Sequence, residues 1–267
     1  HGTSNNTRTE LAQVKKWYPK TANDKLSATL KVMNVSATGD ARVAASHAVV
    51  VGQIHSADAH ENEPLKIFYK KFPGHTKGSV FWHYEINTAG DDNSKRWDYS
   101  TDVWGNDFSV VGTDANTYPE EPKDGIVLGE EFSYEIEVTD GIMNLTFTSK
   151  GHKTRTFTKN LIESEYTTTA NIPEQTQKLF VSIGQDGVER KNAYTGEGCF
   201  FKLGCYNQTN GKSPEVNKNW CSGAETHGGD IKKQYADGNY AEVWFKTSSI
   251  TVSDDAVSNE GYFTKND

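Results

Sequence analysis

The chain has 267 residues and a formal net charge of −8, with 28 Lys and Arg residues against 36 Asp and Glu residues. This acidic balance disfavours a general nucleic-acid binder, and no run is apolar for long enough to predict a membrane span. Aromatic residues make up 11% of the chain, which argues against disorder. The length suits one large domain, which we expect to cover residues 1–267.

The first predicted strand begins at Arg8-Thr9-Glu10-Leu11. Side chains alternate across a strand, so Arg8 and Glu10 share one face while Thr9 and Leu11 share the other. A plain interpretation of Arg8 is a solvated charge that pairs with Glu10. Residues 14–20 predict a loop or short turn, and the alternating run over residues 26–35 predicts a second strand.

A β-branched run over residues 47–55 predicts a further strand. We expect Val50 and Ile54 to face the core, and Gln53 and His55 to be neighbours on the opposite face. A lone histidine is more often structural than catalytic. A glutamine and a histidine two positions apart on the face away from the core have no packing reason to be there, and they are therefore candidate functional residues.

Turn signals separate several more predicted strands. Pro73-Gly74 joins two of them, a polar loop follows at 88–96, and Asp140-Gly141 between alternating runs is a strong hairpin signal. The strand ranges are 64–72, 79–87, 132–138, 142–149, 153–158, 178–184 and 241–253, and the last could pair centrally in a sheet. No amphipathic helix of normal length is predicted. Many strands at short spacing indicate a sandwich or barrel.

The strand predicted at 199–208 has two different faces. Its odd positions are apolar and indicate core, whereas its even positions carry a cation, a phenol and an amide beside an aromatic ring. Such a row suits a sugar, which has an apolar ring face and a hydroxyl rim, although an ordinary amphipathic strand explains it too. The even positions are Phe200, Lys202, Gly204, Tyr206 and Gln208, and the odd positions are Cys199, Phe201, Leu203 and Cys205.

Three cysteines stand at positions 199, 205 and 221. Cys199 and Cys205 share a strand and lie six residues apart, which at roughly 3.3 Å per residue is too far for a disulfide. A disulfide would therefore use Cys221, and we favour the pair Cys205–Cys221. The spacing of cysteines and histidines indicates no zinc site.

Three of these segments carry a family resemblance. They are Arg8-Thr9-Glu10-Leu11, Gln53-Ile54-His55 and the run from Phe200 to Gln208. In this order they resemble the signature strands of the alginate lyases of polysaccharide lyase family 7. Those strands read Arg-Ser/Thr-Glu-Leu-Arg, Gln-Ile/Val-His and Tyr-Phe-Lys-Ala-Gly-x-Tyr-x-Gln. The chain departs from these patterns at Ala12, Phe200 and Leu203.

The resemblance implies a β-jelly roll, a sandwich of two curved antiparallel sheets with a substrate groove on the concave face. It implies β-elimination on alginate, the polymer of mannuronate and guluronate. In that reaction the C5 proton is removed, the 4-O-glycosidic bond breaks and an unsaturated uronate forms. We also expect a secreted monomer that needs no cofactor or metal and binds neither nucleic acid nor a membrane.

The resemblance also implies a role for each matching residue. Arg8 and Gln53 would neutralise the uronate carboxylate and stabilise the enolate-like intermediate, and His55 would donate a hydrogen bond or act as the base. Tyr206 would protonate the leaving oxygen and, after the field of nearby cations has favoured loss of its own proton, abstract the C5 proton. Glu10, Lys202 and Gln208 are candidates for holding neighbouring sugars.

The finer expectations concern charge and specificity. A polyanionic substrate predicts a basic groove although the whole molecule is acidic. In this family, Ile at the centre of Gln-Ile-His goes with activity towards guluronate-containing blocks, although Ile54 should point into the core. Loops at 56–63, 112–125 and 209–235 could decide specificity instead. We expect cleavage within the polymer, as an open groove allows.

Two rival functions fit parts of the sequence. Glu135, Glu137 and Asp140 imitate the catalytic strand of a jelly-roll β-glucan hydrolase, although an exposed acidic strand that ends in a turn explains them better. A non-catalytic carbohydrate-binding module would use the aromatic residues without needing Gln53, His55 and Tyr206 together. The run His60-Glu61-Asn62-Glu63 lacks the second histidine of a zinc protease and indicates a polar loop.

Overall fold

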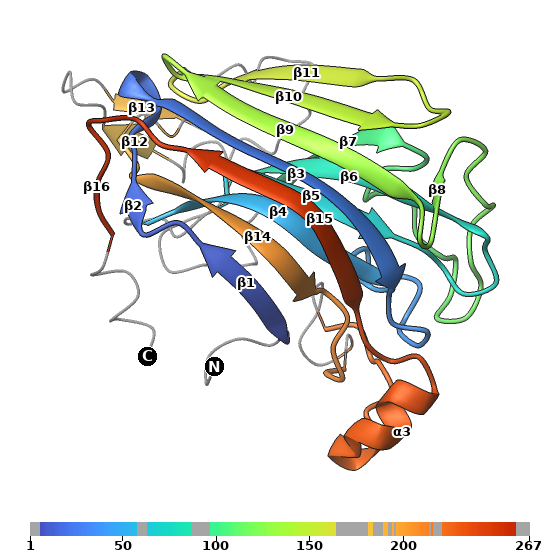
Figure 1. Cartoon of the computed structure of the whole chain (residues 1–267). Helices are drawn as coiled ribbons and strands as arrows, with labels where there is room; N and C mark the ends of the chain where they lie inside the picture. The colour runs from blue at the N-terminus through green and yellow to red at the C-terminus, as the bar shows by residue number, and fades with distance from the viewer. Residues whose placement is uncertain are drawn as a thin grey trace.

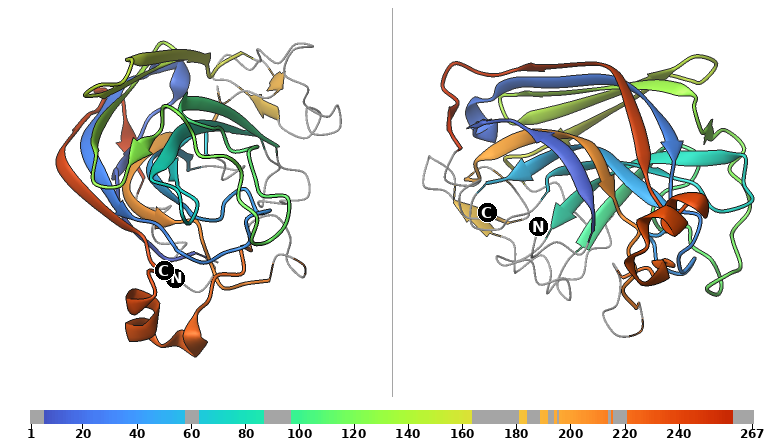
Figure 2. Two further views of the ribbon diagram at one scale, coloured as in Figure 1. Left: turned by 90° about the vertical axis from the view of Figure 1, so that its right-hand side faces the viewer. Right: turned by 60° about the horizontal axis from the view of Figure 1, so that its bottom comes forward.

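Two antiparallel β-sheets stack on one hydrophobic core and make up most of the molecule (Figure 1). The computed structural model describes residues 6–57, 63–86, 97–163, 181–183, 189–191, 194, 196–213, 215 and 221–259. Both sheets are curved, and the short helix α3 (Ile231–Ala236) projects beyond them (Figure 2). This arrangement is the β-jelly roll that the sequence predicts.

The larger sheet has seven strands and runs in the order β1-β14-β4-β5-β6-β7, with β8 paired to β6. Its strands are β1 (Arg8–Ala12), β4 (Ala48–Ser56), β5 (Leu65–Lys70), β6 (Lys77–Ile86), β7 (Trp97–Trp104), β8 (Ile126–Val127) and β14 (Cys199–Asn207). The first and last thirds of the chain thus meet in one sheet, because β14 lies between β1 and β4.

The smaller sheet has five strands in the order β11-β10-β9-β3-β15. Its strands are β3 (Asn23–Asn34), β9 (Glu131–Thr139), β10 (Ile142–Ser149), β11 (Arg155–Asn160) and β15 (Glu242–Thr251). Two short strand pairs lie outside these sheets: β12 (Val181–Ile183) pairs with β13 (Glu189–Lys191), and β16 (Val257–Ser258) pairs with β2 (Lys15–Lys16). The segments η1 (Pro19–Thr21) and η3 (His227–Gly229) are single 3-10 turns. No helix in the described part of the chain has the length and apolar character needed to cross a membrane.

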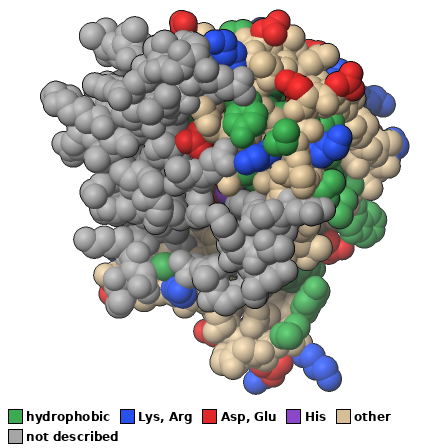
Figure 3. Space-filling view, turned by 90° about the vertical axis from the view of Figure 1, so that its left-hand side faces the viewer, with side chains coloured by type: hydrophobic (Ala, Val, Ile, Leu, Met, Phe, Trp, Pro, Cys, Tyr) green, Lys and Arg blue, Asp and Glu red, His purple; other side chains and the backbone are tan. Residues whose placement is uncertain are grey.

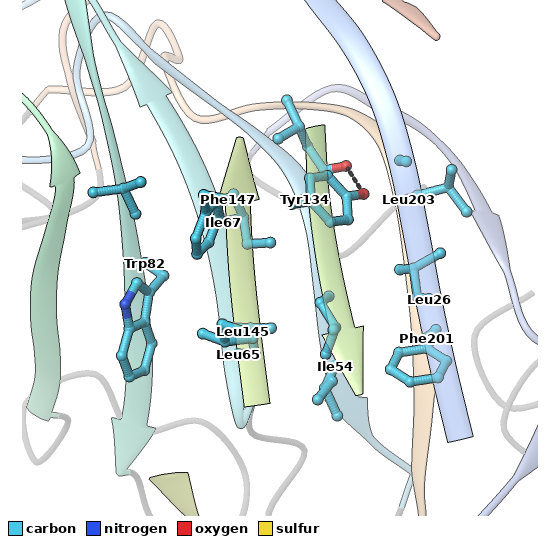
Figure 4. Close-up of a cluster of buried hydrophobic side chains, with 14 of the residues drawn as sticks. Leu26, Ile54, Leu65, Ile67, Trp82, Tyr134, Leu145, Phe147, Phe201 and Leu203 are labelled. Atoms are coloured by element: carbon cyan, nitrogen blue, oxygen red, sulfur yellow. Dashed lines mark hydrogen bonds between the residues drawn. The ribbon is translucent and has the colours of Figure 1, made fainter. Parts of the chain in front are cut away.

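Alternate side chains of both sheets fill the space between them. Ile54, Leu65 and Trp82 come from the larger sheet, and Leu26 and Leu145 come from the smaller one (Figure 4). Tyr134 also crosses the core, and its hydroxyl donates a 2.9 Å hydrogen bond to the carbonyl of Val51 (Figure 4). A hydroxyl buried without a partner would cost free energy, so this bond makes a tyrosine acceptable in the core.

A β-bulge in β4 corrects one prediction. Ile54 faces the shared core as expected, but Val50 packs with Phe68 and Phe81 on the other side of the sheet. The pairing of β4 with β5 shifts register between Val50 and Gly52, so β4 carries one extra residue there. The extra residue reverses the alternation, which places Val50 on the same face as Gln53 and His55.

The hairpin at Asp140-Gly141 is confirmed, because both residues have positive φ angles of 49° and 83° between β9 and β10. Strand β7 was missed, although Trp97, Tyr99 and Val103 alternate with polar residues along it and were a usable signal. The prediction that the last long strand pairs centrally was wrong, because β15 lies at the edge of its sheet and pairs with β3 alone. Of the strand predicted at 178–184, the structure describes residues 181–183.

The predicted disulfide was also wrong, because all three cysteines are free thiols. Cys205 packs against the shared core from the middle of β14. Cys221 is buried outside that core, next to Ser222, whose hydroxyl bonds to the backbone of Asn210. The two thiols belong to different parts of the fold, which the distance in sequence alone did not reveal. Burial raises the pKa of the Cys205 thiol to about 11.

Candidate functional site

The three motif segments lie on the neighbouring strands β1, β14 and β4. Arg8 pairs with Tyr206 across β1 and β14, and Lys202 pairs with Gln53 across β14 and β4. We call the face of the seven-stranded sheet that points away from the shared core the site face. Six of the seven predicted site residues project from it, namely Arg8, Glu10, Gln53, His55, Lys202 and Tyr206.

Gly204 has no side chain, so β1 can approach β14 closely at this position. Gly204 pairs with Glu10, and a Cβ atom placed there would lie only 2.7 Å from the Glu10 Cα. The backbone of Gly204 also has a φ angle of 156°, which L side chains rarely adopt. Because no side chain stands between them, Glu10 on β1 can reach across β14 to Gln53 on β4.

Glu10 connects three donors of the site. Its carboxylate accepts a hydrogen bond from the Gln53 amide, lies 3.1 Å from Lys202 Nζ and lies 4.0 Å from an Arg8 guanidinium nitrogen. Burial lowers the pKa of Lys202, and Glu10 opposes that shift. The carboxylate thus fixes the direction of the donors. The sugar-binding role that the sequence predicts for Glu10 stays a prediction.

Tyr206 lies between cations and an apolar cluster. The Arg8 guanidinium carbon is 5.1 Å from the centre of its ring, and the ring packs against the cluster that includes Val50 and Phe68. Burial raises the pKa of the Tyr206 phenol, and Lys66 and Arg8 only partly offset it. Burial therefore favours the protonated phenol in the free protein, and the role of Tyr206 as a base stays a prediction.

His55 is neutral near pH 7, because burial lowers its pKa to about 4. Its Nδ1 lies 2.6 Å from the carbonyl oxygen of Ser56. A carbonyl only accepts hydrogen bonds, so Nδ1 carries the proton and Nε2 carries the lone pair. The ring contacts Phe200 at 5.3 Å between centroids. This tautomer leaves a basic nitrogen on the site face.

Gln208 differs from the other predicted residues. It follows the last residue of β14, is buried, and donates a 3.3 Å hydrogen bond from its amide to the backbone carbonyl of Tyr206. The expectation that it holds a neighbouring sugar stays a prediction. Its observed contact braces the end of the strand that carries Tyr206.

A second group of charged residues on the site face belongs to none of the three motifs. Lys66 on β5 pairs in register with Gln53 on one side and with His83 of β6 on the other. Its ammonium lies 2.8 Å from Glu85 and 3.0 Å from Glu63. Because Lys66 alternates with the apolar Leu65 and Ile67, the sequence could have predicted that it faces away from the core. Which residues lie beside Lys66 follows only from the register of β5 with β4 and β6.

Three cations of the site face lie beside carboxylates. Arg8 and Lys202 lie beside Glu10, and Lys66 lies beside Glu63 and Glu85. On the face that Figure 3 shows, acidic and basic side chains are interspersed over the described surface. The basic groove stays a prediction, and Lys70 on β5 binds the backbone carbonyl of Ala44 at 2.7 Å.

The acids of the rival hydrolase lie on the other sheet. Tyr134, Ile136 and Val138 of β9 fill the core, so Glu135 and Glu137 project from the opposite side of that strand. Glu135 is 2.7 Å from Lys25 in an exposed ion pair, and Asp140 forms the hairpin turn. These contacts favour the plain interpretation of an acidic outer strand. Within the described ranges, no three His, Cys, Asp or Glu side chains gather as a metal site.

The chain is similar in sequence and in fold to known alginate lyases. A family model described as alginate lyase matches residues 1–252. A curated alginate lyase from Klebsiella pneumoniae is 28% identical over 196 residues, which is 71% of this chain and 50% of that protein. The chain therefore spans half the length of that relative.

The chain resembles several solved structures, among them two alginate lyases. An exolytic alginate lyase of polysaccharide lyase family 7 from Zobellia galactanivorans is 67% identical, with a TM-score of 0.83 over 95% of this chain and 80% of that one. The alginate lyase structure from Klebsiella pneumoniae is 23% identical, with a TM-score of 0.54 over 87% of this chain and 60% of that one. The second likeness concerns the fold alone.

Proposed function

Because the chain belongs to the alginate lyases of polysaccharide lyase family 7, we propose that it cleaves alginate by β-elimination on the site face. The observation that carries this proposal is the meeting of Arg8, Gln53, His55 and Tyr206 on three neighbouring strands. On this proposal the site face is the floor of the groove that holds the polysaccharide.

The first requirement of the reaction is to make the C5 proton acidic. An ionised carboxylate next to C5 resists further negative charge, so donors must stabilise the enolate-like intermediate. Arg8 supplies a guanidinium fork. Gln53 supplies the second hydrogen of its amide nitrogen, because Glu10 takes the first. Lys202 adds positive charge from the same row, while Glu10 keeps all three donors in place.

The charge states of the free protein favour a division of labour between base and acid. Neutral His55 takes the C5 proton on Nε2, and the electrons of the C5–H bond form the C4–C5 double bond. The C4–O bond breaks, and the protonated Tyr206 phenol gives its proton to the leaving oxygen. Tyr206 acting as the base would first have to lose that proton, which burial opposes.

The mode of cleavage is proposed to be exolytic, in place of the internal cleavage expected from the sequence. The 67% identical relative from Zobellia galactanivorans is described as exolytic. In this chain Phe108 covers the floor beyond Lys66, with its ring 4.2 Å from His83 and 5.7 Å from Phe68. Such a cover limits the site face on the side of β5 and β6, and a groove limited at one end suits attack from a chain end.

The remaining features of the proposal come from the sequence. The preference is for guluronate-containing blocks, although Ile54 is buried in the core and can act only through the position of β4. Residues 1–267 form one catalytic domain, secreted and monomeric. Of the loops that could decide specificity, residues 58–62, 214 and 216–220 lie outside the described part of the chain.

The test is an absorbance assay on three substrates, alginate, poly-guluronate and poly-mannuronate. A lyase product has a conjugated double bond that absorbs in the ultraviolet, whereas a hydrolase product has a plain reducing end. The proposal predicts an absorbance rise that is fastest on guluronate-containing substrate and is abolished in Tyr206→Phe. Early release of short products without a fall in polymer length would support the exolytic mode, and a rapid fall in length would contradict it.

A further inference from the structure

Glu63 holds a carboxylate against two groups of the site face. Its Oε2 atom is 3.0 Å from Lys66 Nζ, and its Oε1 atom is 3.6 Å from His55 Nε2. The Glu63 side chain is 13% exposed, whereas those of Lys66 and His55 are 5% and 8% exposed. An acidic side chain thus lies over the nitrogen that the proposed reaction uses as its base.

The charge of Lys66 does not require Glu63. Glu85 is fully buried on the neighbouring strand, and its Oε2 atom is 2.8 Å from the same ammonium. The three groups Lys66, Glu63 and Glu85 together carry a charge of −1 when all are ionised. Two carboxylates beside one ammonium repel each other, so Glu63 is the one that can leave at the smaller cost.

The contact between Glu63 and His55 gives little attraction. The Nδ1 proton of His55 points at the Ser56 carbonyl, so Nε2 presents a lone pair to the Glu63 carboxylate. Two acceptors 3.6 Å apart form no hydrogen bond. Of these two contacts, the one with Lys66 attracts the Glu63 carboxylate, and another carboxylate that reaches Lys66 could take the same place.

We propose that Glu63 occupies, in the free protein, the place of a uronate carboxylate, and that Lys66 binds this carboxylate when the substrate displaces Glu63. This inference rests on the proposed lyase function, because it concerns the same site. In a uronate the carboxylate is bonded to C5, so a carboxylate on Lys66 brings the C5 proton towards His55. Lys66 also pairs in register with Gln53, which places the two donors side by side.

The neighbouring charges agree with such an exchange. Glu63 raises the pKa values of both His55 and Tyr206, whereas Lys66 lowers them. Departure of Glu63 alone would lower both values, and arrival of a substrate carboxylate would restore a charge of the same sign at the same place. The exchange thus leaves the charge around the two reacting groups nearly unchanged.

The test compares Glu63→Gln with Glu135→Gln, which removes one carboxylate from an exposed ion pair on the other sheet. Both variants change the net charge equally, so general repulsion of a polyanion is matched. We expect Glu63→Gln to lower KM for alginate by about threefold to tenfold, with kcat changed less than about twofold. Glu135→Gln should leave both values unchanged.

A double variant tests the role of Lys66 without leaving a buried charge unpaired. Lys66→Met alone leaves Glu85 buried without its cation, so Glu85→Gln is introduced with it, and the melting temperature reports folding. This pair should raise KM about tenfold, and Glu63→Gln should no longer lower KM in its presence. A higher KM in Glu63→Gln, or an unchanged KM in the folded Lys66→Met/Glu85→Gln variant, would overturn the inference.

A binding arm separates this inference from the proposed function. In the Tyr206→Phe background, calorimetry with an alginate trisaccharide measures affinity without turnover. Glu63→Gln should tighten binding by the same factor by which it lowers KM. If the wild type binds the trisaccharide but cleaves no alginate, the lyase proposal fails, while the binding comparison still decides whether Glu63 competes with a uronate. Equal affinity with and without Glu63→Gln would refute the competition.

Discussion

Two lysine–glutamate pairs of the same length differ in almost every other respect. Lys66 and Glu85 lie 2.8 Å apart on the site face, with side chains 5% and 0% exposed. Lys25 and Glu135 lie 2.7 Å apart on the outer face of the smaller sheet, with side chains 38% and 41% exposed. The first pair is therefore buried, whereas the second pair lies in water.

The difference indicates which charges serve function. Removing a lysine and a carboxylate from water costs several kcal/mol per ion, and an apolar pair of similar size is often at least as stable. A protein gains little stability from such a pair, so buried charges call for another explanation. On the site face the row of Lys202, Gln53, Lys66 and His83 runs across four strands, where it can meet a charged polymer.

The largest expected effect on stability comes from breaking the buried pair. Lys66→Met should lower the free energy of unfolding by about 3–5 kcal/mol, because it leaves Glu85 buried without its cation. Lys25→Met should change it by less than about 0.5 kcal/mol, since water solvates Glu135. Urea unfolding of both variants measures the difference. Equal losses in the two variants would show that burial does not separate the sheets.

Acid should destabilise the fold through two buried histidines, His55 on β4 and His47 in the turn before it. Burial lowers the pKa of His55 and of His47 to about 4 in the folded chain, against 6.5 for an ordinary histidine. Between these values the unfolded chain binds more protons, so stability is full above about pH 6.5 and is lost as the pH falls towards 4. Each histidine should contribute about 2 kcal/mol of loss between pH 7 and pH 5.

The histidine prediction is checked by urea unfolding at these two pH values. His55→Gln should lose less stability on acidification than the wild type, because one titrating group is gone. A matched variant outside the sheet is His75→Gln. An unchanged pH dependence in His55→Gln would mean that the buried ring is not neutral.

A smaller effect is expected at Glu10, the carboxylate that joins three donors. Glu10→Gln keeps the size of the side chain but removes the charge that holds Lys202 at 3.1 Å. We expect kcat/KM on alginate to fall about tenfold through loss of donor alignment. Glu131→Gln, which breaks an exposed pair with Lys246, is the control and should keep full activity. A faster Glu10→Gln enzyme would show that Glu10 only repels the substrate.

The smallest effect belongs to the acids of the rival hydrolase. The double variant Glu135→Gln/Glu137→Gln should retain lyase activity within about twofold, because both residues lie on the outer face of the smaller sheet. The rate of absorbance increase on alginate provides the measurement. A collapse of activity with intact folding would move the active site to that sheet.

Alternation along strands made the shared face of Gln53 and His55 predictable from the sequence. It also predicted the separation of Lys202 and Tyr206 from Phe201 and Leu203. The same rule failed at Val50, because a bulge adds one residue and no local sequence signal marked it. The alternation of side chains can be read from one strand, whereas a bulge depends on how that strand pairs with its neighbour.

Lys66, Glu63 and Glu85 show what the sequence left undetermined. Each residue stands in an unremarkable segment, and their contact depends on β5 lying between β4 and β6 in a particular register. The charge state of Tyr206 was likewise beyond the sequence, because burial outweighs the cations whose presence the motif predicts. Sequence patterns identified the site residues of three strands, but the protonation of His55 and Tyr206 depends on their burial in the folded sheet.

The most direct test of the central claim compares two tyrosines, one from each sheet. Tyr206 lies on the site face, and Tyr134 donates its hydroxyl to Val51 in the core. The account predicts that Tyr206→Phe loses at least about 1,000-fold in kcat on alginate and folds normally. Tyr134→Phe should lose about 1 kcal/mol of stability and keep its kcat. A Tyr206→Phe enzyme that still produces the unsaturated uronate at the wild-type rate would contradict the account.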